Sequence, residues 1–378
     1  MRLIYIANAR MPTEKAHGIA IARSCESFAK TGVETVLIVP RRRTPFQTDI
    51  FETYHVERNF SVRFLPTVDL IREKAGKFVF LLQAFTFYVS AFCKLAFSES
   101  RETILFSRDP VAVSLSRLGF RVVLECHLIP KNKKRFFTRA QRADRIIVIS
   151  QALKKAFVEA GFPPESILVA PSGVDLSVFD IDISKEEARK KLDLPIGATI
   201  GVYTGNFTTM GEDKGISDII KALQHAPEVV FVAAGGSDND RDRYVKEASK
   251  MGVLGRVILR GHTPQKMLAL YQKAADVLLM PFPDTPHYRN HMSPVKMFEY
   301  MVAKRPIIAS DLPTIREVLS EQNSIIVPPG NPKKLAAALE TTLQNHDGAQ
   351  SLANQAYNDV ASFSWTARTA RVLAYISE

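Results

Sequence analysis

Cysteine is scarce in this chain of 378 residues, which has three cysteines and a single tryptophan. Cys25, Cys93 and Cys126 are odd in number and widely spaced, and no C-x-x-C pair occurs, so the sequence encodes neither a disulfide framework nor a zinc site. A reducing, cytoplasmic compartment is therefore expected. The opening residues 1–7 form a short apolar strand pattern without the basic and long apolar segments of a signal peptide, so export is not expected.

The chain also has little that suggests a membrane span. Its longest apolar stretch lies between Lys77 and Lys94, and the 16 residues between these lysines include Gln83, Thr86 and Ser90. A spanning helix needs about 20 apolar residues. We expect a core helix of the first domain instead, with an aromatic face that is also suited to contact lipid.

Positive charge is confined to one half of the chain. Residues 1–175 contain 27 Lys and Arg against 16 Asp and Glu, whereas residues 176–378 contain 23 of each. The basic clusters at 41–43 and 131–145 suit an anionic membrane surface or a polyanionic acceptor, and a solvated basic face is the plainer alternative. Nucleic-acid binding is not favoured, because no helix-turn-helix, RRM or zinc-finger pattern accompanies the charge.

Short apolar strands alternate with helical segments along the whole chain. This pattern predicts an α/β protein with two doubly wound, parallel-sheet, Rossmann-like domains. The predicted strands are 3–7, 35–39, 104–107, 122–125 and 145–149 in the first half, and 200–203, 229–233, 257–259, 277–280, 307–309 and 324–327 in the second, with a helix at 19–30.

We expect the first domain to span 1–172 and the second to span 173–361. A final helix, 362–378, is expected to pack back on the first domain, with packing on its own domain as the simpler alternative. Ligands of open α/β sheets bind outside the carboxyl ends of the strands, so the predicted site lies in a cleft that the two domains face.

The segment from His291 to Met301 carries the most specific pattern. Ser293 and Pro294 are expected to form the N-cap and first turn of a helix, whose free amides would face an anion. Lys296 in that first turn suits a phosphate outside the helix. Glu299, one turn on, can accept hydrogen bonds from vicinal hydroxyls such as those of a ribose. A salt bridge between Lys296 and Glu299 is the structural alternative, and spacing alone favours it.

This segment resembles the donor site of retaining glycosyltransferases of family 4, two-domain enzymes of the GT-B fold, in the variant S-P-x-K-x-x-E-Y-M. Further segments resemble the family in order: 171–175, 202–205, 214–215, 232–236, 261–262 and 275–281. Together they cover most of the second half. The resemblance implies transfer of a sugar from a nucleotide diphosphate sugar, with retention, by a front-face mechanism. It also implies that no metal or other cofactor is needed, because the family uses helix amides and lysines.

The resemblance assigns roles to residues of the second half. Lys214 and Lys296 would neutralise the departing diphosphate and so act in catalysis. Gly205 would permit close approach, and His262 would lie near the base, unless it is only an exposed turn histidine. The remaining expected substrate-binding residues of this half are Asn206, His291, Ser293, Pro294, Val295 and Glu299.

In the first half, His17 and Gly18 lie in the loop 13–18, where the family has a glycine-bearing loop that approaches donor phosphate or acceptor. His127 follows a strand. In the family a histidine at this point lies near the transferred sugar, so His127 is the third catalytic candidate. A purely structural role is the alternative. Arg108 could contact acceptor or phosphate, although a local ion pair with Asp109 is favoured.

Two positions depart from the commoner family pattern. His291 stands where many members have a glutamate that touches the donor sugar, and Asn206 stands where many have an arginine. Arg289, or a basic residue of the first domain, could replace that lost cation.

The expected function is therefore a cytoplasmic glycosyltransferase, peripheral at the inner face of the membrane, whose acceptor is a lipid-linked or surface-polysaccharide intermediate. A GT-B sugar-nucleotide epimerase and a non-catalytic nucleotide-sugar-binding relative remain alternatives.

Overall fold

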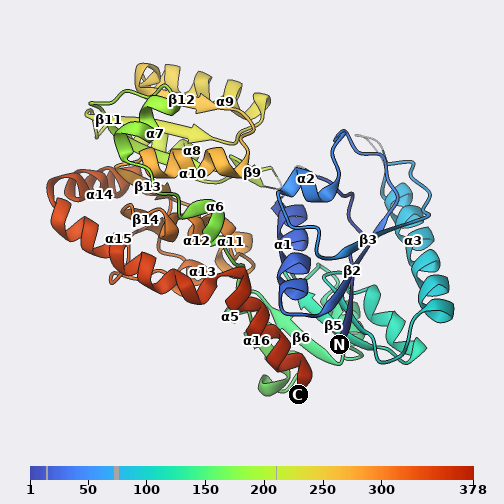
Figure 1. Ribbon diagram of the computed structural model, residues 1–378. Coiled ribbons are helices and arrows are strands. Elements are labelled where there is room, and N and C mark those ends of the chain that lie inside the picture. Colours follow the sequence, from blue (N-terminus) through green and yellow to red (C-terminus); the bar gives the residue numbers. More distant parts are fainter. Residues whose placement is uncertain (14–15, 72–75, 210) are drawn as a thin grey trace. The chain divides into compact units, whose positions relative to one another are not determined.

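The computed structural model describes residues 1–13, 16–71, 76–209 and 211–378, and it divides into two compact units. The first unit comprises Met1–Pro171 together with Trp365–Glu378, and the second comprises Ser172–Ser364. Each unit is built around its own parallel sheet (Figure 1). The predicted fold class, two doubly wound α/β domains, is confirmed.

The sheet of the first unit has seven parallel strands in the order β3-β2-β1-β4-β5-β6-β7. Its central strands are buried on both faces because helices cover both sides, which explains their continuous apolar sequences. The strands are β1 (Arg2–Ile6), β2 (Glu34–Pro40), β3 (Ser61–Leu65), β4 (Ile104–Ser107), β5 (Arg121–Cys126), β6 (Arg145–Val148) and β7 (Ile167–Val169).

Two apolar clusters form the core of the first unit. One contains side chains of α1 (Ala16–Lys30), α2 (Ile50–Tyr54) and α16 (Trp365–Ser377). The other contains side chains of α3 (Lys77–Ser98), the 3-10 helix η1 (Ala112–Leu118), α4 (Lys133–Ala140) and α5 (Gln151–Glu159). A short 3-10 turn, η2 (Pro164–Ser166), leads into β7.

Helix α16 belongs to the first unit although it ends the chain. Ser27 Oγ of α1 donates to the carbonyl of Trp365 at 3.0 Å, and Val372 and Ile376 are fully buried in the same cluster as Phe28. Figure 1 shows this last helix beside α1. The first unit is therefore completed by residues that the chain supplies only after the second unit.

The sheet of the second unit has six parallel strands in the order β12-β11-β8-β13-β14-β15. They are β8 (Thr199–Thr204), β11 (Val229–Ala234), β12 (Val257–Arg260), β13 (Val277–Met280), β14 (Ile307–Ser310) and β15 (Ile325–Val327). A separate two-stranded hairpin, β9 (Thr208–Thr209) with β10 (Glu212–Asp213), follows β8.

The helices of the second unit connect these strands. They are α6 (Leu176–Phe179), α7 (Lys185–Lys191), α8 (Ile216–Ala222), α9 (Asp238–Lys250), the 3-10 turn η3 (Leu254–Arg256), α10 (Gln265–Ala274), α11 (Pro286–Asn290), α12 (Val295–Val302), α13 (Pro313–Arg316), α14 (Pro332–Gln344), α15 (His346–Val360) and the 3-10 turn η4 (Ala361–Phe363).

All eleven predicted strands form within two residues of the predicted ends, and β3, β7 and the β9–β10 hairpin are additional. Strand β3 was not predicted from the sequence because it is a partly exposed edge strand. Its residues Ser61 and Arg63 interrupt the apolar pattern. Among the cysteines, Cys25 and Cys126 are buried, Cys93 is exposed, and none forms a disulfide within the described residues.

Helix α3 is buried on one face and exposed on the other. It runs for 22 residues, and within the described chain it is the one helix long and apolar enough to span a membrane by length and composition. One face is buried, with Gln83, Phe87 and Leu95 in the core. Only 22% of its most apolar window is buried, however, and Phe78, Phe85 and Phe97 are 76%, 67% and 88% exposed. The predicted core helix with an aromatic outer face is therefore confirmed, and contact of that face with lipid stays a prediction.

Candidate active site

Strand order reverses in the second unit beside β8, which pairs with β11 on one side and with β13 on the other. Three glycines near this point have positive φ angles: Gly205 after β8 at 93°, Gly215 after the β9–β10 hairpin at 94°, and Gly235 after β11 at 119°. A Cβ atom at Gly215 would lie 1.9 Å from the Pro281 carbonyl oxygen, and one at Gly235 would lie 2.7 Å from the carbonyl carbon of Gly205. Glycine therefore lets the backbones after β8, β11 and β13 meet closely at a switch point, where such sheets bind ligands.

Lys296 lies in the first turn of α12 at this point. The residue is 9% exposed, and its Nζ lies 3.3 Å from the centroid of the Tyr203 ring and 5.7 Å from that of Phe282. Within the described residues, Nζ has no hydrogen-bond partner. A Cβ atom at Gly205 would lie 3.6 Å from Nζ, so the glycine backbone borders the amine directly. A buried amine without an acceptor is costly unless a ligand supplies one.

Lys214 lies near enough to Lys296 to influence its protonation. Burial, and then the positive charge of Lys214, lower the pKa of Lys296 well below its usual value. Burial also lowers the pKa of Lys214 to about 8. Lys214 precedes Gly215, which is the N-cap of α8, as expected for the residue that opens this helix. Two partly desolvated lysines close together suit a doubly charged anion.

Glu299 lies one turn after Lys296 and is 6% exposed. Gln272 of α10 donates from Nε2 to Glu299 Oε2 at 3.3 Å and to Thr204 Oγ1 at 3.1 Å. Burial raises the pKa of Glu299 to about 7. The salt bridge that spacing favoured between Lys296 and Glu299 is not formed, since Nζ has no such partner among the described residues. That structural alternative was wrong, because the lysine points over Tyr203.

The predicted N-cap was also wrong. Helix α12 starts at Val295, with Pro294 as N-cap and no side-chain cap. Ser293 instead joins the preceding segment to Ser172: the Ser172 amide donates to Ser293 Oγ at 2.8 Å, and Ser172 Oγ donates to the Ser293 carbonyl at 2.9 Å. The serine is used in a tertiary contact, and the first amides of α12 receive no side-chain oxygen in the described structure. Uncapped amides favour an external anion.

The other predicted residues of the second unit lie around this centre with differing exposure. Asn206 is exposed, and its carbonyl accepts a hydrogen bond from the Tyr203 hydroxyl at 2.9 Å. His262 is exposed after β12, while His291 is the C-cap of α11 and is partly exposed, as is Val295. Arg289, the candidate replacement cation, pairs with Asp284, with Nε 2.8 Å from Oδ1.

The sequence contains D-x-D triplets at 180–182 and within 238–242. Paired carboxylates of this kind can hold a metal ion, so their contacts in the structure matter for a site without metal. The structure uses several of these carboxylates locally. Asp240 forms a capping box with Ser237 at the start of α9, Asp238 pairs with Arg241 at 2.9 Å, and Asp180 accepts from the Tyr357 hydroxyl at 2.6 Å. These contacts give the triplets structural roles.

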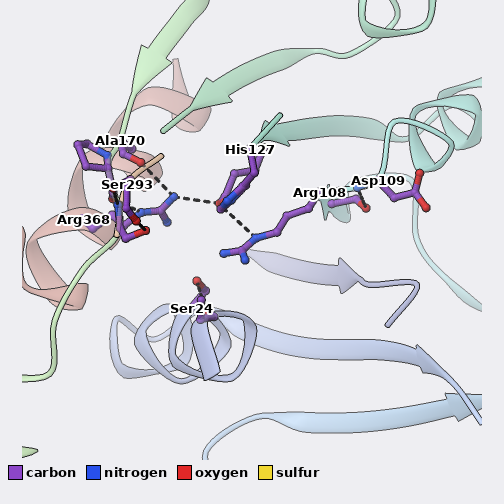
Figure 2. A network of polar contacts seen from close by, with 12 residues as sticks. Ser24, Arg108, Asp109, His127, Ala170, Ser293 and Arg368 are labelled. Atoms are coloured by element: carbon purple, nitrogen blue, oxygen red, sulfur yellow. Dashed lines mark hydrogen bonds and ion pairs between the residues drawn. The ribbon is translucent and has the colours of Figure 1, made fainter. Parts of the chain in front are cut away.

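In the first unit, a charge network surrounds Glu125 at the end of β5 (Figure 2). The carboxylate is fully buried, with Arg108 Nε 3.0 Å from Oε1 and Arg368 Nη2 3.0 Å from Oε2, and His127 Nε2 also contacts Oε1. Arg368 comes from α16 and donates from Nε to the Pro171 carbonyl at 2.8 Å. Two guanidinium groups and one imidazole thus share one buried carboxylate.

The network fixes the charge state of its members. Burial alone would raise the pKa of Glu125, but Arg108, Arg368 and His127 together hold that pKa well below its usual range. Burial, and then the charge of Arg108, lower the pKa of His127 to about 4. At neutral pH the histidine is therefore an uncharged imidazole whose Nε2–H donates to Glu125, while Glu125 is ionised.

The favoured local ion pair between Arg108 and Asp109 was wrong. Arg108 pairs with Glu125, because its side chain points to the neighbouring strand, and Asp109 Oδ1 accepts the Val111 amide at 2.8 Å at the start of η1. In Figure 2 the two side chains point in different directions.

His17 and Gly18 lie in the first turn of α1, and residues 14–15 of the predicted loop lie outside the described residues. Gly18 has a packing reason for its lack of a side chain. A Cβ atom there would lie 2.2 Å from the Tyr54 hydroxyl, which accepts from the Thr13 amide at 2.6 Å. The close approach observed at Gly18 is thus with Tyr54.

Sequence reasoning missed Glu125, Arg368, Tyr203 and Gln272. A charged residue inside the apolar run 122–126 is a signal that could have revealed Glu125, since such a side chain needs a buried partner. Nothing local marks Arg368 or Gln272, because their partners lie 243 and 27 residues away.

Comparison with known families agrees with this architecture. Residues 18–178 match the model "Glycosyltransferase Family 4", and residues 198–345 match "Glycosyl transferases group 1". The two segments together cover most of the chain. Both halves thus carry glycosyltransferase domains, and the architecture is that of the GT-B glycosyltransferases.

Similar curated proteins are named as glycosyltransferases. A Bacillus subtilis protein named as a teichuronic acid biosynthesis glycosyltransferase, TuaC, is 26% identical over 54% of this chain and 48% of its own length. A D-inositol 3-phosphate glycosyltransferase of Corynebacterium urealyticum is 22% identical over 97% of this chain and 92% of its own. The chain spans about half the length of the first curated relatives it matches, at 48% and 50%.

The fold is similar to solved structures. Anabaena Alr3699/HepE, in complex with UDP and glucose, matches with a TM-score of 0.78 and 16% identity over 100% of this chain and 99% of that one. Sucrose-phosphate synthase of Thermosynechococcus elongatus matches with a TM-score of 0.78 and 18% identity over 100% and 98%.

Proposed function

We propose that this protein is a retaining glycosyltransferase that transfers a sugar from a nucleoside diphosphate sugar to an acceptor without a metal ion. The observation that carries the proposal is the buried amine of Lys296, which has no hydrogen-bond partner among the described residues and lies beside a second desolvated lysine, Lys214. A diphosphate supplies the missing acceptors and the opposing charge.

The donor would be held by groups around the end of β8. The diphosphate would contact Lys296, Lys214 and the amides that start α12, while Gly205 leaves room for the phosphate oxygens. Glu299 would accept from the ribose hydroxyls, because its hydrogen bond with Gln272 uses Oε2 and leaves Oε1 for a ligand. The base would lie toward His262, after β12.

Catalysis would rest on stabilising the leaving group. The bond between the anomeric carbon and the diphosphate oxygen breaks, and negative charge develops on the oxygen that the lysines contact. The acceptor hydroxyl attacks from the same side, so the configuration is retained, and its proton passes to the departing phosphate. This step uses no carboxylate nucleophile and no metal. Neutral His127, whose Nε2–H donates to Glu125, would accept a hydrogen bond from a sugar hydroxyl at Nδ1.

The acceptor is proposed to be an anionic lipid-linked or surface-polysaccharide intermediate at the cytoplasmic face of a membrane. Two observations support this. The net positive charge of the chain resides in residues 1–175, and the similar TuaC is named for teichuronic acid biosynthesis. A basic surface attracts polyanions and anionic membranes.

The first test is binding of nucleoside diphosphates to the whole protein in the presence of a chelator, by calorimetry and thermal shift. One diphosphate is expected to bind and raise the melting temperature by mass action. Lys296→Ala is expected to lower the affinity by about 10- to 100-fold, because a charge-assisted contact is lost. The matched control is Lys333→Ala, an exposed lysine of α14 in the same unit, which should bind normally.

Turnover distinguishes transfer from binding alone. Lys214→Ala should slow sugar transfer while the fold stays intact. Equal diphosphate affinity in Lys296→Ala and the parent protein would refute the phosphate site. Conversion of a nucleotide sugar without acceptor would identify an epimerase, and binding without either reaction would identify a non-catalytic relative.

A further inference from the structure

Helix α3 presents an apolar stripe to the outside of the first unit. Phe78, Leu81, Phe85, Val89 and Phe92 recur every three or four residues and therefore share one face of the helix. Their exposed fractions are 76%, 59%, 67%, 46% and 46%. We call these five residues the α3 stripe. Monomeric soluble proteins rarely expose so many large apolar side chains together, so the stripe requires a partner.

The apolar surface extends beyond the helix. The segment after β3 packs along α3, because Thr67 Oγ1 donates to the Gln83 carbonyl at 3.0 Å and the Val68 amide donates to Thr86 Oγ1 at 3.1 Å. These contacts bring Val68, which is 39% exposed, beside the helix. The patch is therefore wider than a single helix face.

The charged residues of helix α3 itself are of one sign, and Asp69, which follows Val68, is paired with Arg42. Helix α3 contains no Asp or Glu, and it has Lys77 at its start and Lys94 in its last turns. Helix α4 buries Phe136 in the same apolar cluster as Phe87 of α3, so both helices cover the same face of the sheet. The exposed side chains of residues 131–135, at the start of α4, include three lysines and an arginine. An apolar stripe on a helix that carries only lysines as charged residues, on the same sheet face as the basic start of α4, matches an anionic lipid surface.

The opposite face of α3 shows how the helix would lie. Gln83, Phe87 and Ala91 are buried in the first unit, and Gln83 Nε2 donates to Asn8 Oδ1 at 3.0 Å. Crossing a membrane would remove these side chains from the core. A helix with one face packed on protein and one apolar face exposed can instead lie in the plane of the interface.

We propose that the α3 stripe is the surface by which this protein docks on an anionic lipid bilayer. The phenylalanines insert at the boundary of headgroups and acyl chains, and the lysines of α3 and α4 contact lipid headgroups. This inference deepens the proposed function by naming the partner surface of the acceptor-binding unit. Vesicle binding is measured without donor or transfer, so its failure is distinguishable from failure of the proposed function.

The test uses the full chain with vesicles of phosphatidylcholine, alone or mixed with phosphatidylglycerol, in sedimentation assays. Phe78→Ser combined with Phe85→Ser and Phe92→Ser is expected to lower partitioning by about 100-fold, because each phenylalanine contributes about fivefold. The control combines Ile196→Ser, Val245→Ser and Leu254→Ser, which removes three exposed apolar residues of the second unit. The control should partition as the parent protein does.

A second readout reports the location of the contact. Cys93 is exposed and adjoins Phe92, whereas Cys25 and Cys126 are buried, so an environment-sensitive fluorophore can be attached at Cys93 alone. Its emission should shift to the blue on mixed vesicles and should stay shifted in high salt, since apolar insertion is not screened.

Three outcomes would overturn the proposal: no binding of the parent protein to mixed vesicles, equal binding by the stripe variant, or an unshifted Cys93 probe on bound protein. If the parent protein self-associates without binding vesicles, and the stripe variant is monomeric, the stripe is a contact between copies of the chain. A normal diphosphate-induced thermal shift in the stripe variant confirms that its second unit is folded.

Discussion

Lys296 illustrates at the scale of one residue how a binding group can oppose stability. Its amine is buried over Tyr203 and has no hydrogen-bond partner in the described part of the chain. Burial favours the neutral amine in the free protein, whereas a bound diphosphate would favour the ammonium form. Diphosphate binding should therefore be accompanied by proton uptake, and the site is costly until its ligand arrives.

Glu299 gives a pH prediction. Burial raises its pKa from an ordinary 4.5 to about 7 in the folded protein. Between pH 4.5 and about 7, Glu299 ionises readily in the unfolded chain but not in the folded protein. The stability that Glu299 contributes is therefore fully present below pH 4.5 and is lost as pH rises through about 7. The shift corresponds to about 3 kcal/mol of unfolding free energy. Glu299→Gln should remove this loss, so the variant gains stability relative to the parent protein between these pH values.

Urea unfolding at several pH values, followed by circular dichroism, measures this difference. Glu228→Gln, which changes an exposed carboxylate of the same unit, is the control and should follow the parent protein. Parallel pH profiles for Glu299→Gln and the parent protein would show that burial does not hold the proton on Glu299.

At the scale of secondary-structure elements, α16 is joined to the first unit by a buried ion network. Arg368 reaches Glu125, and Trp365 at the start of the helix is 7% exposed. Removing Arg368 leaves the buried Glu125 carboxylate with one of its positively charged partners missing. Arg368→Met should therefore lower the unfolding free energy of the first unit by about 3–5 kcal/mol. Arg371→Met, an exposed arginine of the same helix, should have little effect.

Trp365 is the single tryptophan of the chain, so its fluorescence reports directly on α16. Unfolding by urea should shift to lower concentration in Arg368→Met, and the combined change with Glu125→Gln should cost less than the two single changes added together. Additive effects would indicate that Arg368 acts through packing and not through Glu125.

At the scale of the whole molecule, the two units differ in continuity. The second unit is one uninterrupted segment, Ser172–Ser364, whereas the first needs Trp365–Glu378 to complete its core. A chain ending at Ser364 should therefore lose stability in the first unit, because Val372 and Ile376 leave a buried cluster. Its second unit should still bind the diphosphate.

Hydrogen–deuterium exchange of the shortened chain, compared with the full chain, resolves the two units. Peptides from β1, β4 and β5 should exchange faster, while those from β8, β11 and β13 should be unchanged. Equal acceleration in both groups would show that α16 stabilises the molecule as a whole.

The sequence by itself determined the alternation of strands and helices, because buried parallel strands are continuous apolar runs that need no knowledge of their neighbours. It also indicated Lys296 and Glu299 of α12, because a helix start and its spacing are local features, whereas Lys214 was indicated by the resemblance to family 4. Gly205 and Gly215 follow similarly, since their positive φ angles belong to the turns that contain them.

Tertiary structure alone decided which groups meet across the chain. Ser293 forms hydrogen bonds with Ser172 instead of capping α12, and Arg108 pairs with Glu125 instead of Asp109. The partners observed in the structure are not the neighbours in sequence that local spacing suggested. Spacing likewise favoured a Lys296–Glu299 pair, but in the structure Lys296 lies over the Tyr203 ring and Glu299 accepts a hydrogen bond from Gln272. The exposed stripe of α3 was decided in the same way, because composition gives the apolar content of a helix and only packing determines which face is covered.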